Sequence, residues 1–209
     1  RIYNKLSQNF TWWVNKKDQQ GNNIFEGGFL GLDNISILDR SKPLTNGKII
    51  EQSDGTSWMA MFSLNMLNMS LELLDKTERN TYQDMARKYF QHFLIIADAM
   101  NKIGSKAGTD LWNEEDLFYY DILGIPQGDG TYSYEQLKVR SLVGLIPLFA
   151  IDKMDQKFSN NSSFKDFQNQ FSWFMENRKD LTENKNINIK ITKDEENNTL
   201  KGILSLVNQ

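Results

Sequence analysis

The segment from Ser57 to Leu74 constrains the fold most, because it is predicted to form a helix with apolar side chains on nearly every face. One stripe at helical spacing contains Ala60, Leu64, Leu67, Leu71 and Leu74, and a second contains Trp58, Phe62, Met66, Met69 and Leu73. A helix with one apolar face can lie on a surface, whereas a helix that is apolar all round must be covered by other elements. The sequence therefore predicts a buried central helix.

Further helices are predicted around this segment, and they alternate between two kinds. Segments 2–14, 82–100 and 164–174 each carry one apolar stripe, which is typical of outer helices. Residues 139–151 are again apolar all round, and Pro147 is expected to bend that helix. The alternation predicts an all-α domain with an inner ring of helices inside an outer one. A plain helical bundle or a solenoid of helix pairs would give the same pattern, although the absence of a fixed-period repeat disfavours the solenoid.

The residue types in the chain exclude several chemistries. The 209 residues include no cysteine and one histidine, His92. Disulfides, thiol catalysis, cysteine zinc sites and multi-histidine metal sites are therefore excluded, and a Ser-His-Asp triad is nearly so. His92 lies among Phe90 and Phe93 in a predicted helix, which favours a structural role. The absence of cysteine also favours a reducing compartment, and we expect the cytoplasm.

Charge and hydropathy bear on two kinds of partner. A net charge of −3 and a pI near 5.3 give no electrostatic reason to expect nucleic acid or an anionic membrane. The longest apolar run, 142–151, is too short for the roughly 20 residues that a membrane-spanning helix needs. We therefore expect neither nucleic acid nor membrane as a partner.

Two long connections, 18–55 and 106–133, are predicted to hold the functional residues, because loops of this length in a compact domain are usually functional. Their catalytic candidates are carboxylates: Glu26, Asp33, Asp39, Glu51 and Asp54 in the first, and Glu114, Glu115, Asp116 and Asp121 in the second. Enzymes that work with carboxylates alone are dominated by glycosidases. Tryptophans at 12, 13, 58 and 112 flank both loops and suit the C–H faces of a pyranose. Segment 182–199, rich in Asn, Lys and Glu, is predicted to be a mobile hairpin or loop without chemistry.

Simpler explanations remain open for these acidic residues. Acid-rich loops are often solvated surface, and Asp54 could cap the helix that follows it. Segment 114–116 could bind calcium, but it lacks the regular spacing and the glycine of an EF-hand loop, so we expect no metal and no cofactor. The glycines within 27–31 lack the Lys-Ser/Thr that completes a phosphate-binding loop. From the residues alone, the chain is a helical sugar-binding or sugar-cleaving domain.

Several blocks of sequence, taken in order, point to a particular family. They are FTWWVN at 10–15, NIFEGGFLGLDNI at 23–35, LDRS at 38–41, EQSDGTSWMA at 51–60, LWNEED at 111–116 and VRSLVGLIPL at 139–148. Together they resemble the catalytic domain of glycoside hydrolase family 63, in the microbial branch related to mannosyl-oligosaccharide glucosidase. The resemblance covers nearly the whole chain. It implies an (α/α)6 barrel and hydrolysis of α-glucosides with inversion.

The resemblance also implies roles for individual residues. The stretch 29–34 matches the family's acid segment, which makes Asp33 the general acid that protonates the glycosidic oxygen. A second carboxylate would activate water on the opposite face of the sugar, roughly 6.5–9.5 Å from the first. The substrate-binding residues expected from the matching blocks are Asn34, Arg40, Gln52, Asp54, Trp58, Glu115, Asp116 and Tyr120.

The general base of the family lies in a Phe-Tyr-Glu-type segment near the end of the barrel, and no such block occurs here. About half of the helices of a complete barrel are predicted. We therefore expect residues 1–209 to be part of one catalytic domain, an incomplete half-barrel with long functional loops that is inactive alone. Its expected partners are an oligosaccharide or glucoside substrate and the remainder of its own domain. Exposure of inner surface such as 142–149 would favour self-association of the isolated chain.

Two other function classes remain. A non-catalytic carbohydrate-binding helical module would bind sugar without turnover. A sugar epimerase can share the ring of helices, but such enzymes usually use histidine bases, and the single histidine of this chain argues against that class.

Overall fold

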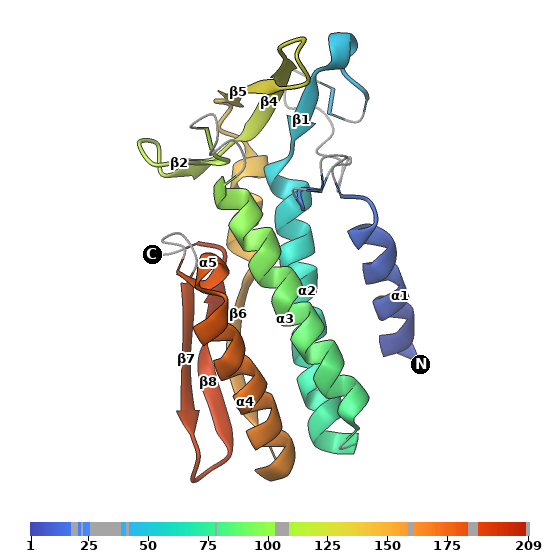
Figure 1. The fold of residues 1–209 in the computed structure, drawn as a ribbon, viewed down its shortest axis with the longest axis vertical. Coiled ribbons are helices and arrows are strands. Elements are labelled where there is room, and N and C mark those ends of the chain that lie inside the picture. The colour runs from blue at the N-terminus through green and yellow to red at the C-terminus, as the bar shows by residue number, and fades with distance from the viewer. Residues whose placement is uncertain are drawn as a thin grey trace.

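The computed structural model describes residues 1–17, 21, 23–25, 39–40, 42–77, 79–102, 109–158, 161–183 and 188–207. The α-helices are α1 (Ile2–Val14), α2 (Ser53–Thr77), α3 (Asn80–Lys102), α4 (Asn161–Asn177) and α5 (Lys179–Thr182), and the 3-10 helices are η2 (Thr45–Gly47) and η3 (Leu142–Phe149). The strands are β1 (Ile49–Glu51), β2 (Trp112–Asn113), β3 (Phe118–Tyr119), β4 (Asp121–Pro126), β5 (Tyr132–Leu137), β6 (Ile151–Lys157), β7 (Asn188–Asp194) and β8 (Thr199–Ser205). Figure 1 shows how these elements are arranged.

The fold is mixed, and the prediction of an all-α (α/α)6 barrel, complete or half, is wrong. The strands form three antiparallel sheets with the orders β1-β4-β5, β2-β3 and β6-β8-β7. The first sheet lies at one end of the long axis, beyond the start of α2, whereas β6-β8-β7 lies beside α4 (Figure 1). Several segments that were predicted to be loops or helix therefore form β-strands.

The antiparallel helices α2 and α3 form the centre of the molecule, with α1 on one flank and α4 on the other (Figure 1). The prediction that this helix is buried on nearly every side is confirmed only in part, because Trp58, Phe62, Met69 and Leu73 of the second stripe are only partly buried. Leu64, Leu67 and Leu71 of one stripe and Met66 of the other are at most 2% exposed. Burial of such side chains supplies the main favourable contribution to folding.

The four predicted segments 2–14, 57–74, 82–100 and 164–174 coincide with α1, α2, α3 and α4. Their apolar stripes meet across the helix layer, since the ring of Phe90 in α3 contacts Phe171 and Phe174 of α4 at centroid distances of 4.9 and 5.8 Å. His92 packs its edge against Phe10 of α1 at 5.3 Å. Burial lowers the pKa of His92 to about 4, so the imidazole is neutral near pH 7 and has the structural role that was expected.

Residues 139–151 differ from the predicted bent helix. The segment forms η3 and then enters β6 at Ile151. Ser141 caps η3 by accepting a hydrogen bond from Val143 N at 3.3 Å, and Pro147 has no N–H to continue an α-helical ladder. Several apolar side chains of this region face solvent, which was expected: Leu142, Leu145, Leu148, Phe149 and Ile151 are 54%, 44%, 46%, 50% and 57% exposed.

Segment 106–133, predicted to be a loop, contains strands, and segment 182–199, predicted to be a hairpin or loop, forms part of a hairpin. Residues 106–133 include β2, β3, β4 and the beginning of β5, and residues 182–199 include β7 and the turn that leads to β8. In the sheet β6-β8-β7, Gly202 at the middle of β8 pairs with Met154 on one side and Ile191 on the other. Within the described ranges, no helix is long and apolar enough to cross a lipid bilayer.

Candidate functional site

Three of the predicted site residues, Arg40, Gln52 and Asp54, lie together where α2 begins. Arg40 Nη1 donates to Asp54 Oδ2 at 3.2 Å, and Arg40 Nη2 forms an ion pair with Asp54 Oδ1. Gln52 Nε2 donates to the backbone carbonyl oxygen of Arg40 at 3.3 Å. The side chains of Arg40 and Asp54 are 1% and 0% exposed, so this two-pronged pair is fully buried.

Asp121, the first residue of β4, also belongs to this group, although it lies far from Arg40 and Asp54 in the sequence. Its Oδ2 lies 2.8 Å from Arg40 Nε, so a single guanidinium bridges two buried carboxylates. Its Oδ1 accepts hydrogen bonds from Ser53 N at 2.9 Å and from Ser53 Oγ at 3.3 Å. We call these three residues the Arg40–Asp54–Asp121 cluster. Asp121 had been counted among the loop carboxylates but not among the predicted site residues.

The start of α2 explains why carboxylates gather here. The first turn of a helix leaves backbone N–H groups without partners inside the helix and carries a partial positive charge. Asp121 accepts from the N–H of Ser53, and Asp54 Oδ1 accepts from the N–H of Gly55 at 2.8 Å. The two carboxylates therefore bind both the N–H groups of the helix end and the guanidinium of Arg40. This agrees with the simpler explanation that Asp54 caps the helix.

Phe25 and Arg40, which flank residues 26–38 in the sequence, are both held at this first turn of α2. On the N-terminal side, Phe25 N donates to Thr56 Oγ1 at 3.1 Å. On the C-terminal side, Arg40 is fixed by Asp54, Asp121 and Gln52. The predicted general acid Asp33 and its neighbour Asn34 lie within this segment, outside the described residues.

Trp58 lies one helical turn after Asp54, on the same face of α2. Its indole ring contacts the ring of Phe149 at a centroid distance of 5.7 Å, and Phe149 is half exposed. Trp58 Nε1 is buried and donates to no residue in the part of the chain that the structure describes. An aromatic side chain with a free polar edge thus follows directly after the buried charges.

The other predicted site residues belong to a second location. Glu115 is exposed in the turn between β2 and β3. Tyr120 Oη donates to Asp116 Oδ2 at 3.2 Å, and Arg140 Nη2 and Lys138 Nζ lie 2.8 and 3.3 Å from the Asp116 oxygens. Burial raises the pKa of Asp116, but the hydrogen bonds from Arg140 and Lys138 outweigh it and lower the pKa. Asp116 is therefore an ionised partner of two cations.

The described residues contain no group of three or more His, Asp or Glu side chains that could hold a metal ion. At the segment considered for calcium, the Asp116 oxygens are occupied by Arg140 and Lys138.

The buried Asp121 makes the stability of the protein depend on pH. Burial raises the pKa of Asp121 to about 6, against the lowering effects of Arg40 and of the Ser53 N–H. In an unfolded chain the value is about 3.9, so Asp121 contributes most below about pH 4 and loses that contribution as the pH rises through 6. We expect Asp121→Asn, which cannot ionise, to gain stability relative to the unmodified protein between pH 4 and pH 7. Urea denaturation of both proteins measures this, and a constant difference across the range would contradict it.

Comparison with known proteins finds a similar yeast protein. No family model and no solved structure matches the chain. The chain is similar to the uncharacterized protein YMR196W of Saccharomyces cerevisiae, with 47% identity over 191 residues that cover 87% of this chain. Those residues cover 17% of the yeast protein, so the chain spans about a sixth of the length of this relative.

Proposed function

We propose that this chain belongs to an inverting glycoside hydrolase that acts on α-glucosides, with Asp33 as the general acid. The general base lies in sequence beyond these residues, so the 209-residue chain alone is inactive. Asp33 protonates the glycosidic oxygen while the second carboxylate removes a proton from water on the opposite face of the sugar. The resemblance of the ordered sequence blocks to glycoside hydrolase family 63 is what suggests the reaction.

The observation that carries the proposal is that Phe25 and Arg40, which flank residues 26–38 in the sequence, are both held at the first turn of α2. A general acid must be held within hydrogen-bond reach of the atom that it protonates, and a loop achieves this only when rigid elements support it. The hydrogen bond from Phe25 to Thr56 and the buried contacts of Arg40 supply that support at the first turn of α2. Arg40 and Asp54 then act by positioning the segment, because their polar atoms are used inside the protein.

The surroundings of the cluster suit a sugar. Trp58 offers an indole ring one helical turn after Asp54, and its buried N–H has no acceptor within the described chain. Aromatic rings with a polar edge bind ligands that are apolar on one face and polar at the rim, as a pyranose is. We assign Trp58 and Asn34 to the substrate, with an oligosaccharide or simple glucoside as the ligand.

The exposed apolar side chains of η3 and β6 suit a covering partner. Leu142, Leu148, Phe149 and Ile151 are each at least 46% exposed, and clusters of this kind usually mark an interface. We propose that the remainder of the catalytic domain covers them, which fits a relative about five times as long. The absence of cysteine supports a cytoplasmic parent enzyme.

The stereochemistry of the product tests the proposal. The full-length parent protein is mixed with maltose, and proton NMR follows the anomeric signals during the first minutes. We expect β-glucose to be released first from the non-reducing end, before mutarotation produces the α-anomer. Initial release of α-glucose would exclude inversion. Binding of maltose without hydrolysis would favour the alternative, a non-catalytic carbohydrate-binding module.

A further inference from the structure

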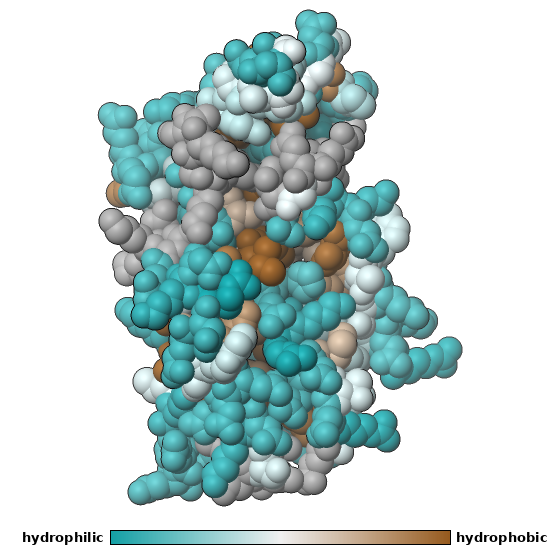
Figure 2. Space-filling model, in the orientation of Figure 1, coloured by the Kyte–Doolittle hydropathy of each residue, from teal (hydrophilic) through white to brown (hydrophobic). Residues whose placement is uncertain are grey.

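A groove between α3 and α4 lies apart from the cluster at the start of α2. Its volume is about 430 Å³, and it is lined by Arg87, Gln91, Asn169, Gln170, Trp173 and Phe174. This volume falls in the range of pockets that hold small molecules, roughly 300–1,000 Å³. The face that carries α3 and α4 is mostly hydrophilic (Figure 2). Most of the lining surface of the groove itself is apolar, so the groove suits a ligand that presents C–H faces as well as polar groups.

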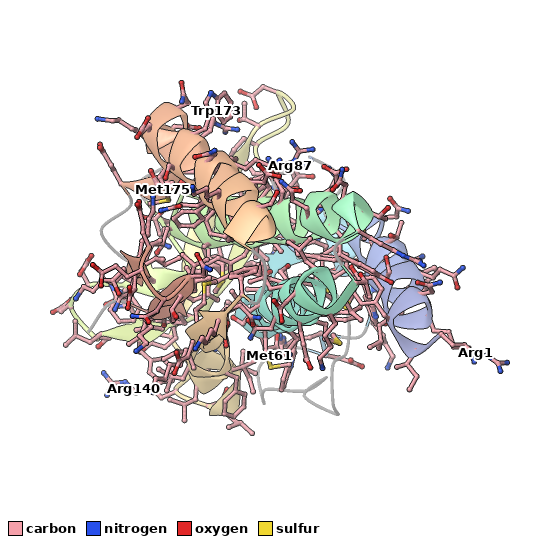
Figure 3. The ribbon with its side chains drawn as sticks, turned by 90° about the horizontal axis from the view of Figure 1, so that it is seen from below. Arg1, Met61, Arg87, Arg140, Trp173 and Met175 are labelled. Atoms are coloured by element: carbon pink, nitrogen blue, oxygen red, sulfur yellow. The ribbon has the colours of Figure 1, made fainter. Side chains whose placement is uncertain are left out.

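Trp173 stands out in this groove because its side chain is exposed while its neighbour is not. Trp173 is 60% exposed, whereas Phe174 is 5% exposed and packs against Phe90 in the core. The core of α4 is thus complete without Trp173. Figure 3 shows Trp173 on α4 and Arg87 on α3, on the same side of the molecule. An indole at the surface of a groove presents a flat face with a negative π-cloud, which attracts polarised C–H groups.

Amide side chains form most of the remaining lining. Gln91 comes from α3, and Asn169 and Gln170 come from α4. The Gln170 Oε1 atom is buried and accepts no hydrogen bond from any residue that the structure describes. The amide groups that a groove ligand can reach are therefore those of Gln91 and Asn169. An amide both donates and accepts, which matches the hydroxyl groups of a neutral polyol.

The charge in the groove is largely balanced. Arg87 Nη2 donates to Asp84 Oδ1 at 3.3 Å, within the same helix. The guanidinium is therefore neutralised on one side and can donate further hydrogen bonds on the other. An anionic ligand would meet no unbalanced cluster of positive charge among the groove residues. A neutral ligand with many hydroxyl groups fits this balance best.

We propose that the α3–α4 groove is a second carbohydrate site, which binds a neutral α-glucan oligosaccharide with one sugar ring stacked on Trp173. The choice of α-linked glucose rests on the proposed function, whereas the choice of a neutral sugar rests on the groove itself. Gln91, Asn169 and Arg87, which line the groove, hydrogen-bond to hydroxyl groups of the sugar. The site retains long substrates away from the reaction centre.

The indole N–H signals of the 209-residue chain test this site. The chain has five tryptophans, at 12, 13, 58, 112 and 173, so their ¹⁵N–¹H signals are few and Trp173→Phe identifies the relevant one. Maltoheptaose is titrated in, with cellohexaose as the comparison. We expect maltoheptaose to shift the Trp173 signal, and Trp173→Ala to weaken binding at least tenfold.

Tyr132 provides a control, because it is a partly exposed aromatic residue on β5 and does not line the groove. Tyr132→Ala should leave the affinity unchanged. A Trp173 signal that neither sugar shifts, as expected for a groove that binds a peptide, would overturn the proposal. Binding of cellohexaose alone would overturn the α-glucan assignment. Hydrolysis by the parent enzyme is measured separately. Hydrolysis without sugar binding in the groove would contradict only the groove proposal, and sugar binding without hydrolysis would contradict only the proposed reaction.

Discussion

Replacing Arg40 with alanine is expected to lower the free energy of unfolding by about 3–5 kcal/mol, the usual result of removing one partner from a buried ion pair. The guanidinium is 1% exposed and lies between the carboxylates of Asp54 and Asp121, which are both inaccessible to solvent. Its removal leaves two negative charges close together without water or a counter-ion. Urea denaturation followed by circular dichroism measures the change, provided that the slope against urea concentration stays constant.

Two further variants make this expectation specific. Arg87→Ala removes a guanidinium that pairs with Asp84 at the surface, where both side chains are at least half exposed, and should have a much smaller effect. A triple variant, Arg40→Met with Asp54→Asn and Asp121→Asn, removes the charges together and should recover part of the loss. If Arg40→Ala were as mild as Arg87→Ala, Arg40 would be free to serve the substrate and the positioning role would be wrong.

Replacing Asp33 with asparagine in the full-length parent should lower kcat on maltose by about 10²- to 10⁴-fold, which is the range for loss of a general acid. Asparagine keeps the size of the side chain but cannot donate a carboxyl proton. A substrate with a good leaving group, p-nitrophenyl α-glucoside, needs less protonation of that group. Its hydrolysis should therefore suffer less than that of maltose, and this difference identifies acid catalysis rather than misfolding.

Asp39 supplies the matched control for this substitution, since it is a carboxylate that directly follows residues 26–38 in the sequence. It forms an ion pair with Lys42 at 2.8 Å and is 38% exposed. Asp39→Asn should leave both substrates nearly unaffected. Equal losses on maltose and on the activated glucoside in Asp33→Asn would remove Asp33 as the acid, and unchanged activity would do so directly.

The helices could be predicted from the sequence because their signals are local. Phe167, Phe171 and Phe174 lie on one side of α4, and the spacing alone shows which side is buried. The strands could not be predicted in this way, because they pair with residues distant in sequence and several of their faces carry both apolar and polar side chains. β6 reads Ile-Asp-Lys-Met-Asp-Gln-Lys and buries only Met154, while Ile151 at its start is exposed. Such a strand shows little of the alternation that marks a sheet with one buried face.

The candidate site was predictable in part for the same reason. Arg40, Gln52 and Asp54 are near in sequence and meet as expected. Asp121 meets them only because β4 pairs with β1, where Glu51 lies opposite Ile122. A polar residue at the start of the apolar run Ile122–Gly124 was the available signal. Glu115 and Asp116 were predicted to bind substrate because they belong to the sequence block 111–116. In the structure they lie in the turn of the β2–β3 hairpin.

The bond between Asp121 and the first turn of α2 bears on how the molecule comes apart. Strand β4 holds the helix end through Ser53, and the helix end holds β4 through Arg40. Separating the strand from the helix leaves a buried carboxylate without its cation and helix N–H groups without acceptors. Partial opening at this junction is therefore unfavourable. The end sheet and the central helix pair are therefore expected to open together, as one cooperative unit with shared protection against hydrogen exchange.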